Sequence, residues 1–174
     1  MGRGLGKHRG LKGQDMEIHE TDAGMYAAHA EIGGFVARCS LLDYRVSQFV
    51  ARWFCKHEKQ KFLSYTLKAM PFAEKRQVIE ERLSNWHKDA DALREAMTEI
   101  AAVLERRNLV ANGVLSRRSS GTLCIKSFSA ARFVSDKGAI DIIDISDLPT
   151  LSEQASELSE RLIDLGNNLR DIAE

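Results

Sequence analysis

The sequence predicts a mainly α-helical protein, an antiparallel helical bundle with a C-terminal β-hairpin and a closing amphipathic helix. Apolar residues recur at alternating spacings of three and four in residues 23–54, 93–104 and 151–172, which is the period of helices with a buried face. Residues 122–146 break this period and are rich in β-branched side chains. The 174 residues are 44% hydrophobic, which is enough for one core.

The first helix is predicted over residues 23–54, where one apolar stripe persists for several turns. A second apolar line, which includes Val36 and Val50, widens the stripe, so we expect neighbours on more than one side of this helix. The pair Gly33-Gly34 weakens the helix near its start and marks a kink or a close helix crossing. The stripe consists of Ile32, Phe35, Cys39, Leu42, Val46, Phe49 and Trp53.

Two further helices complete the helical core, which is predicted over residues 23–113. Pro71 fits the first turn of a helix over residues 71–86. The next helix begins near Lys88, and Gly113 is placed to terminate it. Its apolar stripe is Leu93, Met97, Ile100 and Leu104.

The hairpin is predicted over residues 122–146, with strands at 122–134 and 139–146 and a turn at Ser135-Asp136-Lys137-Gly138. The final helix is predicted over residues 150–173, because Thr150-Leu151-Ser152-Glu153 has the pattern of a capping box. No linker divides residues 21–174, which we assign to a single domain.

Residues 1–20 are predicted to form a flexible basic arm, because their first 13 residues hold four cations, no acids and few apolar side chains. This arm is interpreted either as a weak phosphate contact or as a solvated tail. Over the whole chain, 25 basic and 25 acidic residues cancel, so net charge favours neither nucleic acid nor membrane.

Neither a cofactor nor a metal ion is expected. The five histidines and the three cysteines lack metal-ligand spacing, and no phosphate-binding glycine motif occurs. No apolar run reaches the ~18 residues of a membrane span, and no signal peptide is recognised. A cytoplasmic protein without a membrane partner is therefore predicted.

The end of the third helix carries the candidate site. Arg107 prolongs the apolar stripe, and Asn108 and Asn112 lie four residues apart on one face. An arginine in this position either extends out of the core or is held toward a partner, and its forked guanidinium suits a phosphate. The alternative is structural: Arg107 pairs with Asp43, and Asn112-Gly113 is only a helix cap. Four arginines cluster around this end: Arg106, Arg107, Arg117 and Arg118.

The segment Arg107-Asn108-Leu109-Val110-Ala111-Asn112-Gly113 resembles the signature of the HEPN superfamily. That signature is an arginine, commonly followed by Asn or Asp, and a histidine a short interval later. In this chain the histidine position holds Asn112. The likeness extends over residues 25–172 and includes Ser40-Leu41-Leu42-Asp43 and Pro71-Phe72-Ala73-Glu74-Lys75.

The resemblance implies a HEPN-like bundle and a metal-independent endoribonuclease of a toxin–antitoxin or phage-defence type. Arg107 would hold the scissile phosphate, residue 112 would assist proton transfer, and Asp43 would orient Arg107. The partners implied are RNA, a second copy in a homodimer, and an antitoxin or another defence-system protein. The residues expected to bind RNA beside them are Asn108, Arg106, Arg117 and Arg118.

Asn112 changes the expected activity, because an amide does not titrate near neutral pH and cannot replace imidazole as a general acid or base. The sequence therefore predicts an enzyme that is inactive as written, whether Asn112 is natural or an inactivating substitution. The alternative is a non-catalytic helical module for dimerisation or adaptor binding.

Overall fold

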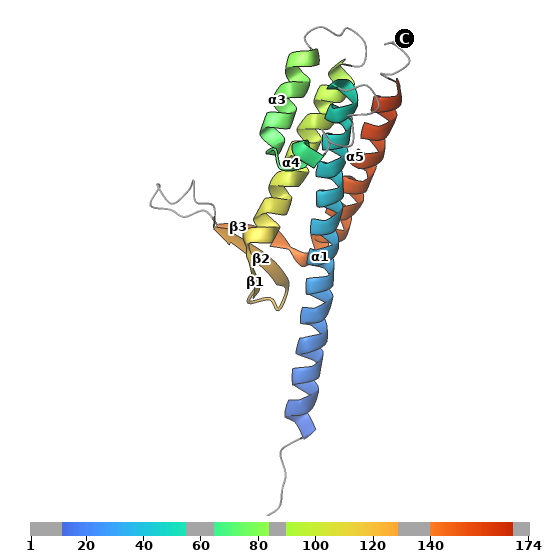
Figure 1. The fold of residues 1–174 in the computed structure, drawn as a ribbon. Coiled ribbons are helices and arrows are strands. Elements are labelled where there is room, and N and C mark those ends of the chain that lie inside the picture. The colour runs from blue at the N-terminus through green and yellow to red at the C-terminus, as the bar shows by residue number, and fades with distance from the viewer. Residues whose placement is uncertain (1–11, 55–64, 84–89, 129–139, 169–174) are drawn as a thin grey trace, which may run out of the picture.

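The computed structural model describes residues 12–54, 65–83, 90–128 and 140–168 and shows a mainly helical fold with one small antiparallel sheet (Figure 1). Side chains are described from residue 23 onward within these ranges, with a few exceptions at segment ends. The helices are α1 (Lys12–Phe54), α3 (Phe72–Leu83), α4 (Ala90–Asn112) and α5 (Leu148–Asn168). The strands are β1 (Val114–Arg117), β2 (Leu123–Phe128) and β3 (Ile140–Asp144), and the 3-10 turn η3 spans Ile145–Asp147.

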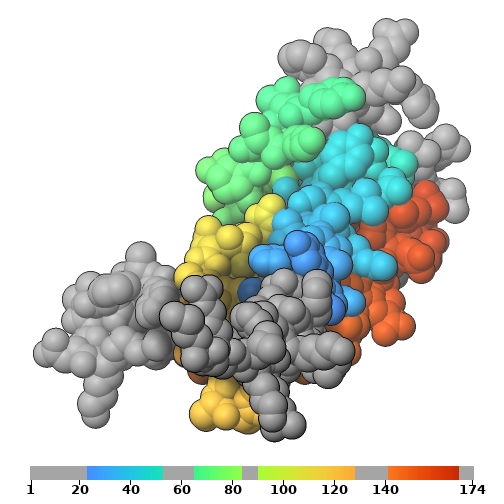
Figure 2. Space-filling view, turned by 90° about the horizontal axis from the view of Figure 1, so that it is seen from below, coloured from blue at the N-terminus to red at the C-terminus, as the bar shows by residue number. Residues whose placement is uncertain are grey.

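Helices α1, α4 and α5 pack against one another and enclose the core. Helix α1 lies between α5 on one side and α3 with α4 on the other, as both views show (Figures 1 and 2). The predicted stripes fill this core, because an apolar residue on every turn of each helix meets the other two. Its fully buried members include Phe35, Leu42, Val46, Leu93, Met97, Ile100 and Leu162.

Helix α1 has 43 residues, and its N-terminal part extends beyond α4 and α5 (Figure 1). It begins at Lys12, so residues 12–20, which were predicted to belong to a flexible arm, are helical. Residues 1–11 lie outside the described part of the chain. The predicted close crossing at Gly33-Gly34 is wrong, because a Cβ at either glycine would have open space around it. Helix α1 runs through both glycines without a break.

The sheet has three strands in the order β1-β2-β3, so the predicted hairpin is one strand short. Strand β1 follows α4 directly and pairs with β2 from Val114 opposite Lys126 to Arg117 opposite Leu123. A turn closed by the Arg118 N–H, 2.8 Å from the Thr122 oxygen, joins the two strands. Residues 129–139, which include the predicted turn at 135–138, lie outside the described residues.

Helix α5 begins at Leu148, two residues before the predicted start. The turn η3 leads straight into it, and the backbone N–H of Leu148 donates to the Ile145 carbonyl oxygen. Thr150 therefore lies inside the first turn, where it is not the N-cap that the capping-box prediction required. Within the described residues the predicted apolar stripe faces the core, where Ala155, Leu158 and Leu162 are buried, while its last part, residues 169–172, lies outside them.

Candidate functional site

Arg107 lies near the end of α4 and is half-buried. Its NH1 group donates a hydrogen bond to Asn108 Oδ1 at 3.0 Å, while its Nε is buried without a partner. No carboxylate in the described part of the chain forms an ion pair with it. The site therefore contains a partly desolvated cation whose charge is not neutralised by those residues.

The charge of Arg107 acts on Cys39 of α1, which indicates that the guanidinium lies near that helix. Burial raises the pKa of the Cys39 thiol to about 11, and the nearby positive charge of Arg107 acts in the opposite direction. Cys39 has no exposed surface. Arg107 therefore lies near α1, and its buried Nε shows that the side chain does not extend freely into solvent.

Asp43 was expected to orient Arg107, but in the described residues it pairs with Lys75. Lys75 Nζ lies 2.7 Å from Asp43 Oδ1, the lysine side chain is fully buried, and the carboxylate is 31% exposed. No hydrogen bond or ion pair joins Asp43 to Arg107 in this part of the chain. Sequence reasoning missed Lys75, because a lysine beside a glutamate in a short polar helix has the pattern of a solvated surface.

Asn108 and Asn112 are both exposed and lie one turn apart on one face of α4, as predicted. Asn112 is the last residue of the helix. Because it follows Arg107 by five residues, it leaves the helix axis in a different direction from Arg107. The two residues are therefore neighbours at one helix end, but the hydrogen bond of Arg107 goes to Asn108 and not to Asn112.

Gly113 ends the helix for a reason that the sequence did not show. A Cβ on Gly113 would collide with the Ile125 side chain of β2 and lie 2.8 Å from the Leu109 carbonyl oxygen. The left-handed conformation that usually favours glycine at a helix end occurs instead at Gly121 in the β1–β2 turn, with φ 89°. Gly113 thus allows the sheet to pack closely against the end of α4.

The four arginines separate into two pairs. Arg106 is exposed beside Arg107 on α4, whereas Arg117 and Arg118 lie at the far end of β1, about 10 Å along the strand. Arg117 donates to the Gly121 carbonyl oxygen at 3.2 Å. Arg118 lies 2.9 Å from Asp144 of β3. Arg118 therefore braces the sheet and is already neutralised.

No protein-family model, curated protein or solved structure matches the chain. Among the described residues, no helix has the length and apolar character to cross a bilayer. Within the same residues, no group of three histidine, cysteine or acidic side chains is arranged to hold a metal ion. The chemistry of the site therefore follows from its own side chains.

Those side chains can bind an anion but cannot move a proton readily near neutral pH. Arg107 offers a guanidinium fork, and Asn108 and Asn112 add amide donors and acceptors. No imidazole or carboxylate is bonded to Arg107 in the described residues. The arrangement suits binding of a phosphate group and lacks a general acid or base beside it.

Proposed function

We propose that the chain is a HEPN-like, RNA-directed protein whose Arg107 binds a backbone phosphate at the end of α4. The observation that carries the proposal is the half-buried guanidinium of Arg107, with Nε unpartnered and no described carboxylate in contact. A partly desolvated cation costs free energy unless an anion neutralises it. A phosphate supplies both the charge and the paired oxygens that the guanidinium fork fits.

The reaction class proposed is that of metal-independent endoribonucleases of toxin or phage-defence systems. In such a reaction Arg107 would stabilise the charge that develops on the phosphate. The residue at position 112 would transfer the proton, and Asn112 cannot do so, which removes a contribution typically worth ~10²–10⁴-fold in rate. The chain as written is therefore proposed to bind RNA and to cleave it poorly or not at all.

We further propose a compartment, an oligomeric state and a partner for the protein. It would act in the cytoplasm as a homodimer, with an antitoxin or another defence-system protein as its partner. Asn108, Arg106 and Arg117 would contact RNA beside Arg107, and their exposure is compatible with that role. Arg118 contributes less than the sequence predicted, because Asp144 already neutralises it.

A non-catalytic dimerisation or adaptor module is the second candidate, and one feature of the sheet favours it. Val114 and Ile142 are exposed on the two edge strands, and Lys126 lies between them in the same row. Exposed apolar residues in one row of a sheet are typical of a protein contact. The row of Val114, Lys126 and Ile142 lies next to the end of α4. A partner protein bound to it would therefore cover the region where RNA is proposed to bind.

The Asn112→His variant distinguishes the two candidates. The ribonuclease proposal expects this variant to cleave single-stranded RNA and to slow growth when expressed, while the native chain does neither. Ala111→His is the matched control, because it places an imidazole at the adjacent exposed position of α4 and leaves Arg107, Asn108 and Asn112 unchanged. If Asn112→His leaves RNA intact and growth unchanged, the ribonuclease proposal is abandoned and the adaptor module remains.

A further inference from the structure

A second apolar stripe runs along α1 on the side that faces away from the core. Its members follow one another at spacings of four and three, and every one of them is exposed. Cys39, on the core side of the same helix, lies about 160° around the helix axis from this stripe. Alternating spacings of four and three are typical of a helix that packs against another helix. The exposed stripe consists of Ala23, Ala27, Ala30, Gly34, Ala37 and Leu41.

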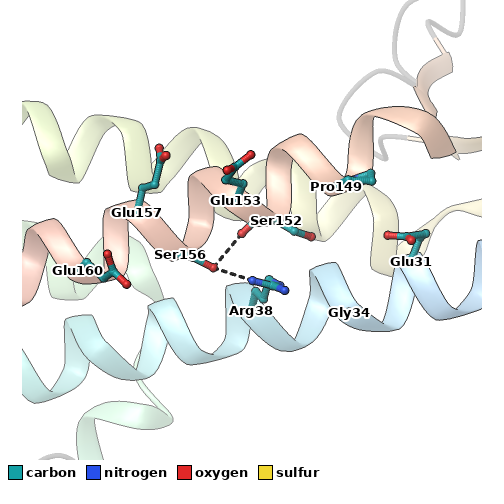
Figure 3. A pocket seen from close by; sticks show the side chains of 9 residues that line it. All are labelled: Glu31, Gly34, Arg38, Pro149, Ser152, Glu153, Ser156, Glu157 and Glu160. Atoms are coloured by element: carbon teal, nitrogen blue, oxygen red, sulfur yellow. Dashed lines mark hydrogen bonds between the residues drawn. The ribbon is translucent and has the colours of Figure 1, made fainter.

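The first turns of the exposed stripe project beyond the start of α5. Pro149, the second residue of α5, lines the same groove as Glu31 of α1, so α5 begins at about the level of Glu31 (Figures 1 and 3). The turns of α1 from Lys12 to Ala30 precede that level. Helices in water gain most of their stability from packing an apolar face against a neighbour. The exposed stripe therefore offers the projecting turns a surface on which a further helix would stabilise them.

The side chains of the exposed stripe differ in size along its length, which indicates the helix that fits it. From Ala23 to Ala37 none is larger than a methyl group. Leu41 follows, with 50% of its surface exposed, and Tyr44 is the next residue at the same spacing. An antiparallel copy of α1 sets the small end against the large end. A parallel copy sets small residues against small ones and Leu41 against Leu41, which leaves gaps beside a crowded layer.

One antiparallel register matches the sizes layer by layer. When Gly34 faces the partner's Ala37, the partner's Leu41 faces Ala30 and enters the hole between Ala27 and Gly34. That hole is open, because nothing lies within 4 Å of a Cβ built on Gly34. The two-fold symmetry of such a pair repeats the same contacts with the two copies exchanged.

The same register matches the charges beside the stripe. Glu31 and Arg38 lie on the side toward α5, one before Gly34 and one after it (Figure 3). In the described part of the chain neither forms an ion pair, and Arg38 donates one hydrogen bond, 2.9 Å long, to Ser156 Oγ. With Gly34 facing the partner's Ala37, Glu31 lies beside the partner's Arg38, and symmetry supplies the reciprocal pair. Size and charge therefore indicate one and the same register.

We propose that the exposed stripe of α1 binds the same stripe of a second copy, antiparallel, with Gly34 opposite the partner's Ala37. Burial of the apolar side chains drives the association, and the two pairs of Glu31 with Arg38 fix its register. Cys39 marks the opposite side of α1, and Arg107 lies near it. The interface therefore leaves Arg107 uncovered, and the proposal does not depend on RNA binding.

A charge exchange on the full chain tests the register by sedimentation velocity without RNA. Glu31→Arg and Arg38→Glu each set like charges opposite one another twice, so each variant alone should associate about tenfold more weakly than the native chain. An equimolar mixture of the two should recover native association, because the heterodimer restores both pairs. The double variant should recover it as well. Single variants that associate normally, or a mixture no stronger than either alone, would overturn the proposal.

Two adjacent exposed residues of α1 supply a matched pair of variants for the packing. Ala30→Trp fills the hole that the partner's Leu41 enters and should weaken association at least tenfold. His29→Trp adds the same bulk at an exposed position outside the stripe and should leave association unchanged. Circular dichroism should show native helix content for both, because neither side chain is buried in the single chain. Equal association of the two variants, or a native chain that stays monomeric at all concentrations, would contradict this interface and leave RNA binding by Arg107 untouched.

Discussion

Lys75 and Asp43 form a buried ion pair that joins α3 to α1, with Nζ 2.7 Å from Oδ1. The two partners differ in exposure: the lysine has no contact with solvent, whereas the carboxylate keeps about a third of its surface in water. The loss of either partner should therefore have unequal effects, because only one of the charges left behind can be hydrated.

Asp43→Asn is expected to lower the free energy of unfolding by about 3 kcal/mol, since it leaves a buried ammonium without a counter-charge. Lys75→Met should cost less, about 1 kcal/mol, because it replaces a buried stem with an apolar side chain of similar length and leaves a carboxylate that water can reach. Urea denaturation of both variants measures the difference. Equal losses of unfolding free energy would show that the hydration of the Asp43 carboxylate does not reduce the cost of removing Lys75.

Gly113 and Gly33 make a second contrast. Gly113→Ala should destabilise the protein by about 1–3 kcal/mol, because the added methyl collides with Ile125 and crowds the Leu109 carbonyl oxygen. Gly33→Ala, in open space inside α1, should stabilise it by up to about 1 kcal/mol through helix propensity. Thermal denaturation compares the two variants. A neutral Gly113→Ala would mean that the sheet can move away from α4 at little cost.

The helices could be predicted because their apolar pattern depends on residues only three or four positions apart. Apolar residues at spacings of three and four placed the buried faces of α1, α4 and α5, and Phe35, Leu42 and Val46 have no exposed surface. Strand β1 could not be predicted this way, because four residues after a helix become a strand only through pairing with β2. The start of α5 was misplaced for a similar reason: η3 continues into the helix and makes the capping residues unnecessary.

The candidate site was predicted in position and only partly in geometry. Asn108 and Asn112 share a face because the helix period requires it. The partner of Asp43 depends on how α3 packs, and the sequence of α3 gives no sign that Lys75 is buried. The pairing of Arg118 with Asp144 likewise depends on where strand β3 packs, because Asp144 follows Arg118 by 26 residues in sequence. The sequence therefore predicted which element carries each of these charged residues, but not always its ion-pair partner.

The proposed role of Arg107 leads to a prediction about salt. Arg107→Ala should lower RNA affinity about tenfold and reduce the slope of log affinity against log salt by about 1, because one phosphate contact is lost. Arg107→Lys should retain most of the slope, since the charge remains, but recover only part of the affinity, since the guanidinium fork is absent. Filter binding or fluorescence anisotropy over a salt series measures both quantities.

Arg118→Ala is the control for this series, because it removes the same side chain type from a position where Asp144 already neutralises it. Its salt slope should match that of the native chain once folding has been verified by circular dichroism. The opposite pattern, a reduced slope for Arg118→Ala and a native slope for Arg107→Ala, would place the RNA contact on the sheet. In that case the unpartnered Nε of Arg107 would be a structural feature of the α1–α4 contact, and the proposal for this site would fail.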